Sequence, residues 1–138
     1  MDFDSALHKM VDVALQAGEI IIADYQKEHQ IFIDEQEILK SSRNISTATD
    51  LKVDSFAIGE LERLFPDYSI ITEESKARIK NSRFSHQVDP IDGSIPFLTG
   101  MSINFCYSDA LCENNEPIVA VIFNPLTKEL FTAIKGKG

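Results

Sequence analysis

The sequence predicts an α+β fold in which two long helices pack on a mainly antiparallel sheet. Apolar residues recur at helical spacing in two stretches of the first half, and short β-type runs separated by turn residues fill the second half. Helices that precede a block of strands, rather than alternate with them, are typical of this class. The chain has 138 residues, enough for one domain with a core of its own.

The first predicted helix covers residues 4–28, where Asp4 or Ser5 can cap it. Its apolar positions are Leu7, Met10, Val11, Ala14, Ala17, Gly18, Ile21 and Tyr25. The second covers about 50–65 and ends before Pro66, which cannot continue a helix. Its inner face is Val53, Phe56, Ala57, Leu61, Leu64 and Phe65. Both stretches are amphipathic, so each is expected to bury one face.

Between these helices, residues 30–40 carry isolated isoleucines and predict a pair of short strands around Asp34 and Glu35. Residues 41–46 are polar and are expected to form a loop.

After the second helix, residues 68–72 predict a short buried strand, and residues 87–89 predict another. The segment between them, residues 75–86, is polar and lacks apolar periodicity, so we expect a mobile loop. Residues 95–98 are compatible with a short helix.

The last third of the sequence predicts an antiparallel meander with strands over 103–112, 117–124 and 129–134. The connections at 113–116 and 125–128 are rich in turn formers. Three residues here and just before are expected in the core: Met101, Phe105 and Phe131.

Composition and charge narrow the function classes. Hydrophobic residues make up 43% of the chain, and the net charge is −9. A bare nucleic-acid-binding surface would be basic, so direct binding of nucleic acid is not expected. No apolar run approaches the roughly 20 residues of a membrane span, and the acidic start does not resemble a signal peptide. Cys106 and Cys112 are too far apart on one straight strand to pair, which favours core thiols in a reducing compartment, the cytoplasm.

The most informative segment is residues 87–94, Gln-Val-Asp-Pro-Ile-Asp-Gly-Ser. A turn at this point can direct the carboxylates of Asp89 and Asp92 and the carbonyl of Ile91 toward one point. Hard oxygen ligands of this kind suit Mg²⁺, and also Mn²⁺. If a helix begins near Ser94, its free N–H groups together with that of Gly93 would face an anion there. A metal and an anion at one place indicate phosphate chemistry.

Two further acidic elements support this interpretation. Glu73 and Glu74 follow the predicted strand 68–72, and Asp50 opens the second helix. Each element alone is ordinary, because a glutamate pair is usually a solvated strand end and an aspartate suits a first helical turn. An isolated Asp-Pro-Ile-Asp-Gly is also most often only a turn. Their joint occurrence, each at the end of an element, predicts a metal site.

The three elements, Asp50-Leu-Lys52, Glu73-Glu74 and Asp89-Pro-Ile-Asp-Gly-Ser94, stand in the order found in the inositol monophosphatase superfamily, which the whole chain resembles. Its members are Mg²⁺-dependent, lithium-sensitive phosphatases. The resemblance implies a five-layer αβαβα sandwich in the complete protein. It also implies that residues 1–138 are the N-terminal, metal-binding domain, and that a second half, absent here, adds a further aspartate ligand and most substrate contacts.

The resemblance assigns a role to each acidic residue. Glu73 binds the first metal ion and helps to orient the attacking water. Asp89 and the carbonyl of Ile91 complete the protein ligands of that ion. Asp89 also bridges to a second ion that Asp92 holds.

The remaining roles concern a third ion, the nucleophile and the phosphate. Glu74 and Asp50 match residues that support a third, weaker ion or orient the water. The hydroxyl of Ser94 helps to activate the nucleophile. The phosphate is expected to lie against Asp92, Gly93 and Ser94.

The sequence leaves several functions open. The leading hypothesis is an Mg²⁺-dependent phosphomonoesterase that hydrolyses a small phosphorylated substrate such as inositol monophosphate with a metal-activated water. A 3′-nucleotidase or a relative of fructose-1,6-bisphosphatase is the enzymatic alternative. The other alternative is a non-catalytic interaction module, since some bacterial relatives act in transcription and ribosome assembly. No membrane partner is expected, whereas a homodimer or self-association is, because the absent half would leave an apolar face. His8, His29 and His86 match no ligand spacing and are expected at the surface.

Overall fold

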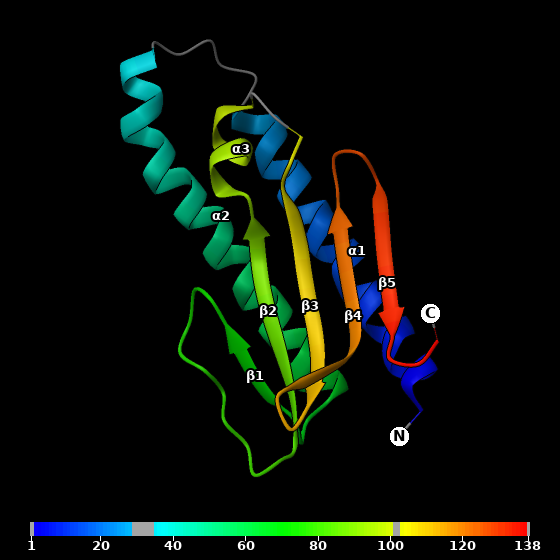
Figure 1. Cartoon of the computed structure of the whole chain (residues 1–138). Coiled ribbons are helices and arrows are strands. Elements are labelled where there is room, and N and C mark those ends of the chain that lie inside the picture. Colours follow the sequence, from blue (N-terminus) through cyan, green and yellow to red (C-terminus); the bar gives the residue numbers. More distant parts are fainter. Residues whose placement is uncertain (1, 29–34, 101–102, 138) are drawn as a thin grey trace.

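The computed structural model describes residues 2–28, 35–100 and 103–137, and shows two long helices on one face of a five-stranded sheet (Figure 1). In chain order the elements are α1 (Phe3–Glu28), α2 (Glu35–Leu64), β1 (Ser69–Thr72), β2 (Phe84–Asp92), α3 (Ser94–Thr99), β3 (Cys106–Glu113), β4 (Glu116–Asn124) and β5 (Glu129–Ile134). This confirms the predicted α+β class. Within these ranges no helix is both long and apolar enough to cross a membrane.

The strands lie in the order β1-β2-β3-β4-β5. β1 and β2 are parallel, and every other neighbouring pair is antiparallel, so the meander predicted for the last third of the chain is confirmed. The single parallel pair brings the carboxyl ends of β1 and β2 to the same end of the sheet.

The core lies between the helices and one face of the sheet. The predicted inner faces of both helices are buried or half-buried, with Met10, Ala17 and Ile21 of α1 and Leu61 of α2 fully covered. Contact between α1 and β4 is close at Gly18, where a Cβ would stand 2.4 Å from the ring of Phe123. The other face of the sheet has no helix over it in Figure 1.

The segment before residue 50 differs from the prediction. The helix α2 begins at Glu35, so residues 35–46 form neither a strand nor a loop. Its opening run, Glu-Gln-Glu-Ile-Leu-Lys, consists mostly of strong helix formers. These propensities outweigh the isoleucines and serines on which the prediction rested. The rest of the predicted strand pair, residues 30–34, lies outside the described residues.

The expected mobile loop is shorter than predicted, because β2 begins at Phe84 rather than at residue 87. The loop is also tied to β1 midway along its length. The amide of Arg78 donates to the carbonyl of Ile70 at 2.7 Å, and the amide of Lys80 donates to Ser69 Oγ at 2.9 Å. Its mobility stays a prediction, but its backbone has fixed contacts with the edge of the sheet.

Of the three expected core residues, Phe105 is buried, whereas Phe131 is 61% exposed and was predicted wrongly. Phe131 pairs with Ile122 of β4 on the face of the sheet that the helices leave uncovered. Met101 lies outside the described residues.

His86 is the second wrong prediction of burial, since its side chain is fully buried rather than at the surface. It lies on the helix-facing side of β2, with its ring centroid 4.7 Å from that of Phe65. His86 Nδ1 is 3.0 Å from a carboxylate oxygen of Asp109, which is equally buried on β3. His8 is exposed, as predicted, and His29 lies outside the described residues.

Candidate metal and phosphate site

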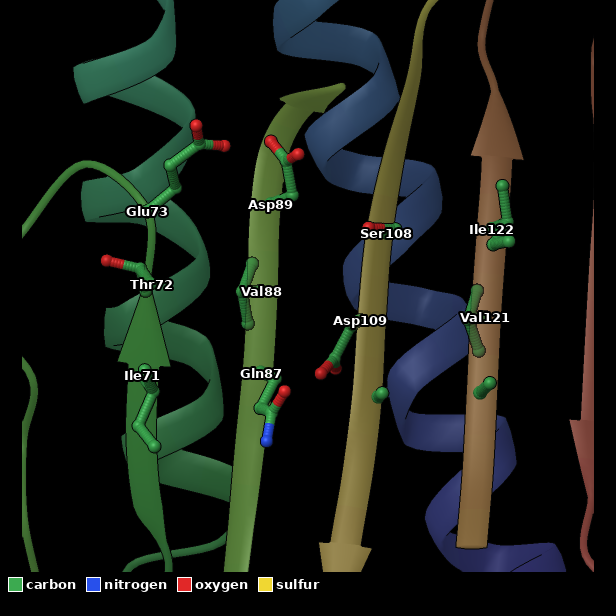
Figure 2. A pocket seen from close by; sticks show the side chains of 12 residues that line it. Ile71, Thr72, Glu73, Gln87, Val88, Asp89, Ser108, Asp109, Val121 and Ile122 are labelled. Carbon is green, nitrogen blue, oxygen red and sulfur yellow. The ribbon is translucent and has the colours of Figure 1, made fainter. Parts of the chain in front are cut away.

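The acidic residues of two motifs meet where the parallel strands end. Thr72, the last residue of β1, pairs with Val88 of β2, so Glu73 comes directly beside Asp89. Figure 2 shows both carboxyl groups at this end of the sheet, on neighbouring strands. The two groups are close enough that Glu73 raises the pKa of Asp89, both by its charge and by hydrogen bonding. Carboxyl ends of strands are the usual place for ligand sites in sheets with parallel strands.

A bulge near the end of β2 aligns the two aspartates of the motif. Asp89 pairs with Ser108 and Asp92 pairs with Cys106, so three steps along β2 match two steps along β3. In a regular strand, residues three apart point to opposite faces. The extra residue of the bulge therefore returns Asp92 to the face of the sheet that Asp89 occupies.

The crowding of carboxyl groups changes their proton affinity. Burial, the neighbouring charges of Glu73 and Asp92, and the hydrogen bond to Glu73 raise the pKa of Asp89 to about 7. Burial and the charges of Glu73 and Asp54 also raise the pKa of Glu74. Like charges held this close disfavour ionisation of one another, and a bound cation would relieve that repulsion.

The opposing strand contributes a thiol to the same locus. Burial and the charges of Asp92 and Asp89 raise the pKa of the half-buried Cys106 to about 11. The thiol therefore keeps its proton at neutral pH. Hard cations such as Mg²⁺ prefer oxygen, so this thiol is a neighbour of the site rather than a ligand. Both cysteines are free.

The phosphate end of the motif is a tight turn followed by a short helix. Gly93 has φ 92°, and a Cβ there would lie 2.3 Å from the carbonyl oxygen of Asn104, so only glycine fits. The hydroxyl of Ser94, the first residue of α3, donates to the carbonyl of Ile91 at 3.3 Å. Asp50 is buried on α2, which packs against α3. The motif, as predicted, links a strand end to a helix start.

The structure brings some of the predicted ligands together and leaves others apart. Glu73 and Asp89 are in contact, and Asp92 acts on Asp89 through its charge. Across residues 2–28, 35–100 and 103–137, however, no three carboxylate, imidazole or thiol side chains converge as a ready metal cage. Mutual repulsion separates carboxylates when no cation is bound, and Mg²⁺ sites are commonly completed by water and substrate phosphate.

One carboxylate at the site was missed from the sequence. Asp54 is buried on α2, and its Oδ2 accepts a hydrogen bond from the hydroxyl of Ser75, directly after the glutamate pair. The signal was available, because Asp54 follows Asp50 by four residues and so lies on the same side of the helix.

Below the acidic residues, the uncovered face of the sheet forms a shallow groove of about 520 Å³. Its open-face lining comes from four neighbouring strands, in part from Ile71, Gln87, Ser108, Ala120 and Ile122 (Figure 2). Glu73 and Asp89 lie at one end of the groove, and its remaining lining combines apolar residues with the polar side chains of Thr72, Gln87 and Ser108.

Comparison with known proteins agrees with this arrangement. The model of the inositol monophosphatase family matches residues 4–138. The chain is 37% identical over 133 residues to the "Nus factor SuhB" of Xylella fastidiosa (strain Temecula1 / ATCC 700964), covering 96% of this chain and 46% of that protein. It is 34% identical over 136 residues to "Inositol monophosphatase 3" of Solanum lycopersicum, covering 93% of this chain and 47% of that protein.

Solved structures give the same result. The extragenic suppressor protein suhB from Bartonella henselae superposes with a TM-score of 0.81 at 30% identity, covering 97% of this chain and 50% of that one. An inositol monophosphatase from Anabaena (Nostoc) sp. PCC 7120 superposes with a TM-score of 0.79 at 25% identity, covering all of this chain and 47% of that one. The chain thus spans about half the length of the relatives it matches, and its fold is the N-terminal half of theirs.

Proposed function

Because this chain belongs to the inositol monophosphatase family, we propose that it supplies the metal- and phosphate-binding half of an Mg²⁺-dependent phosphomonoesterase. The substrate class is a small phosphorylated molecule such as inositol monophosphate. The single observation that supports this best is the contact between the carboxyl groups of Glu73 and Asp89, with Asp92 aligned beside them by the bulge.

The donor set fits a hard divalent cation. The described acids at this locus carry oxygen ligands, and no lysine or arginine is ion-paired with Glu73, Asp89 or Asp92 in the described part of the chain. Glu73, Asp89 and Asp92, with the carbonyl of Ile91, would hold Mg²⁺, and Mn²⁺ suits the same ligands. Glu74 lies next to them as a support for a further, weaker ion.

When bound, divalent ions in such a site lower the pKa of water and stabilise the leaving oxygen. The chain's own groups would do the rest. The N–H groups of Gly93 and Ser94 would bind phosphate oxygens next to Asp92, and the positive φ of Gly93 sets the direction of these donors. Asp50 and the Ser94 hydroxyl would orient the attacking water, and Glu73 would share that task.

The test is calorimetric titration of the purified chain with Mg²⁺ and with Mn²⁺, followed by a phosphatase assay. We expect one divalent ion to bind and Asp89→Asn to abolish that binding. Turnover by the 138 residues alone is expected to be slow or absent, because the relatives have about as many residues again. Losing substrate orientation can cost several kcal/mol of barrier lowering, and each ~1.4 kcal/mol is tenfold in rate. Equal metal affinity in wild type and Asp89→Asn would remove the basis of the proposal.

The assay panel should include inositol monophosphate, a 3′-nucleotide and fructose 1,6-bisphosphate, since a 3′-nucleotidase or a fructose-1,6-bisphosphatase relative has the same metal chemistry.

The free thiols Cys106 and Cys112 favour a cytoplasmic location. The net charge of −9 makes direct binding of nucleic acid an unfavourable alternative. A second copy of the chain, associating through the uncovered face of the sheet, is a further expected partner.

A second candidate function follows from the relatives named "Nus factor SuhB", which match over 96% of this chain. On this alternative the chain is an interaction module in transcription or ribosome assembly, and metal binding is dispensable. The titration separates the two candidates, because a non-catalytic module has no need of a divalent ion at Asp89 and Asp92.

A further inference from the structure

The buried carboxylate Asp54 connects helix α2 to the turn that carries Glu73 and Glu74. Its side chain is 1% exposed, and Oδ2 accepts the hydrogen bond from Ser75 Oγ. Ser75 is the residue directly after the glutamate pair, and it lies 21 positions from Asp54 along the chain. A long-range hydrogen bond therefore ties the turn to the helix layer.

The same turn is closed locally by a second hydrogen bond. The backbone N–H of Ser75 donates to Thr72 Oγ1 at 3.1 Å. Ser75 is thus held twice, through its backbone to the end of β1 and through its side chain to α2. Glu73 and Glu74 lie between Thr72 and Ser75 in this turn, and both are exposed.

The hydrogen bonds of Ser75 have to hold the turn in place against repulsion between carboxylates. Glu73 lies against Asp89, and the charges of Glu73 and Asp54 both act on Glu74. Like charges at this spacing favour opening of the turn. A hydrogen bond to an ionised acceptor is about twice as strong as a neutral one, so Asp54 is a suitable tether.

We propose that Asp54 is a positioning residue that clamps the turn of residues 72–75 onto α2 through Ser75, so that Glu73 is held beside Asp89 before a divalent cation binds. The inference rests on the proposed function for its metal. Asp54 is not itself a ligand in this proposal, and it acts through the Ser75 hydroxyl.

The interior side of Asp54 suggests a conservative variant. Its Oδ1 is buried without a hydrogen-bond partner among the described residues, and the same is true of the Tyr107 hydroxyl. Burial and the charges of Asp109 and Asp54 raise the pKa of Tyr107, so its hydroxyl stays protonated. In Asp54→Asn the amide oxygen can still accept the hydrogen bond from the Ser75 hydroxyl. Asparagine thus keeps the clamp and loses only the charge.

The test compares four variants with wild type: Asp54→Ala, Asp54→Asn, Ser75→Ala and the double variant Asp54→Ala/Ser75→Ala. The control is Glu129→Ala, which removes an exposed carboxylate that accepts a local hydrogen bond from the Thr127 hydroxyl, 2.8 Å away. Thermal unfolding in EDTA first defines a temperature at which every variant is folded. All further measurements are made below that temperature.

The first readout is amide hydrogen exchange of the metal-free protein, resolved by peptides. We expect Asp54→Ala and Ser75→Ala to accelerate exchange over residues 71–79 by at least about tenfold, the size expected from a lost charged hydrogen bond. Asp54→Asn should stay within about threefold of wild type, and the double variant should be no faster than either single one. Unchanged exchange in Asp54→Ala, or equal acceleration in Asp54→Ala and Asp54→Asn, would overturn the clamp.

The second readout is Mn²⁺ affinity by calorimetry. Removing a residue that orients a metal ligand typically weakens binding 10- to 100-fold, so Asp54→Ala should lose about tenfold and Asp54→Asn little. Asp89→Asn serves as the ligand control. If wild type and Asp89→Asn bind Mn²⁺ equally, the proposed function fails, while the exchange experiment still decides the clamp. If Asp89→Asn abolishes binding and Asp54→Ala does not weaken it, the inference fails and the proposed function stands.

Discussion

Two acid-centred clusters lie on opposite faces of the same two strands, and they differ in how their charge is balanced. On the uncovered face, Asp89 of β2 is surrounded by further carboxyl groups, and these raise its pKa to about 7. On the helix-covered face, Asp109 of β3 lies against the imidazole of His86, at 3.0 Å, with both side chains fully buried. The two clusters are adjacent along the strands, because Val88, the residue before Asp89, pairs directly with Asp109.

The difference is the one expected between an acid that stabilises the fold and an acid in the proposed metal site. A buried carboxylate that serves the fold has a polar partner, because an unpartnered buried charge costs several kcal/mol. The carboxylates at Glu73, Asp89 and Asp92 have one another instead, at a partly exposed edge of the sheet. This arrangement lowers the stability of the metal-free fold, and a cation from solution can compensate for it. The four predictions below test the two sides of this contrast.

The largest expected effect is on the buried pair. Asp109→Leu alone leaves the buried Nδ1 of His86 without its hydrogen-bond partner, and we expect a loss of about 1–3 kcal/mol in the free energy of unfolding. The double variant His86→Phe/Asp109→Leu should recover most of that loss, because a packed apolar pair leaves no buried polar group without a hydrogen-bond partner. Urea unfolding measures both. Asp12→Leu, on the exposed side of α1, is the control and should stay within about 0.5 kcal/mol of wild type.

A double variant as unstable as Asp109→Leu would show that the His86–Asp109 pair does more than satisfy two buried polar side chains. Such a result would weaken the contrast between the two clusters, because the His86–Asp109 pair would then have a role beyond stabilising the fold.

The second effect concerns metal binding. Asp92→Asn should weaken Mn²⁺ or Mg²⁺ binding by about 100-fold while leaving the fold intact. Removing one carboxylate also relieves repulsion on Asp89, so the unfolding free energy of the metal-free variant should equal or exceed that of wild type. Calorimetric titration and urea unfolding in EDTA are the two measurements. A lower stability in EDTA would mean that Asp92 is a structural acid.

The pH dependence of the metal-free protein gives the third test. The folded state raises the pKa of Asp89 from its ordinary value near 4 to about 7, so the folded state holds the proton more tightly. The stabilising contribution of the protonated group is complete below about pH 4 and is lost as the pH rises toward 7. Because the group is partly exposed, the slope should be well below the ~1.4 kcal/mol per pH unit of a full proton. Urea unfolding in EDTA between pH 4 and 7 measures it.

Asp89→Asn should flatten this dependence, since the variant has no proton to exchange at that position. Glu129→Asn, at an exposed position on β5, three strands from β2, should leave it unchanged. An unaltered slope in Asp89→Asn would assign the effect to another acid.

Most of the fold could be predicted from the sequence, because the spacing of the apolar residues matches the helices and strands that the structure shows. The inner faces of both helices and the meander followed from apolar spacing alone. The extent of α2 was missed, since the predicted inner face began at Val53, whereas the helix opens at Glu35 with a run of strong helix formers. Local propensity extends that helix without any amphipathic signal.

The site was predictable as a set of residues but not as a geometry. The motif Asp89-Pro-Ile-Asp-Gly-Ser contains both aspartates, yet the bulge that aligns Asp89 with Asp92 is a property of the pairing with β3. The burial of His86 and the exposure of Phe131 have one common cause. Which face of a strand is covered depends on where the helices pack, and alternation along a strand does not reveal that.

The smallest expected effect on stability comes from the uncovered face itself. Phe131, Ile122 and Ile71 are 61%, 44% and 37% exposed, on a sheet with no helix over that side. Burying a large apolar side chain is worth about 1.5–3 kcal/mol, whereas association costs at least about 4 kcal/mol in lost freedom of motion. Self-association should therefore be weak and rise with concentration. Phe131→Ser should lower the mass measured by sedimentation at high concentration while changing the unfolding free energy by no more than about 0.5 kcal/mol. Ile79→Ser is the control, because Ile79 is 71% exposed but lies in the loop between β1 and β2. A chain that stays monomeric at every concentration, or an equal response to both variants, would show that apolar exposure on this face has no partner in a second copy.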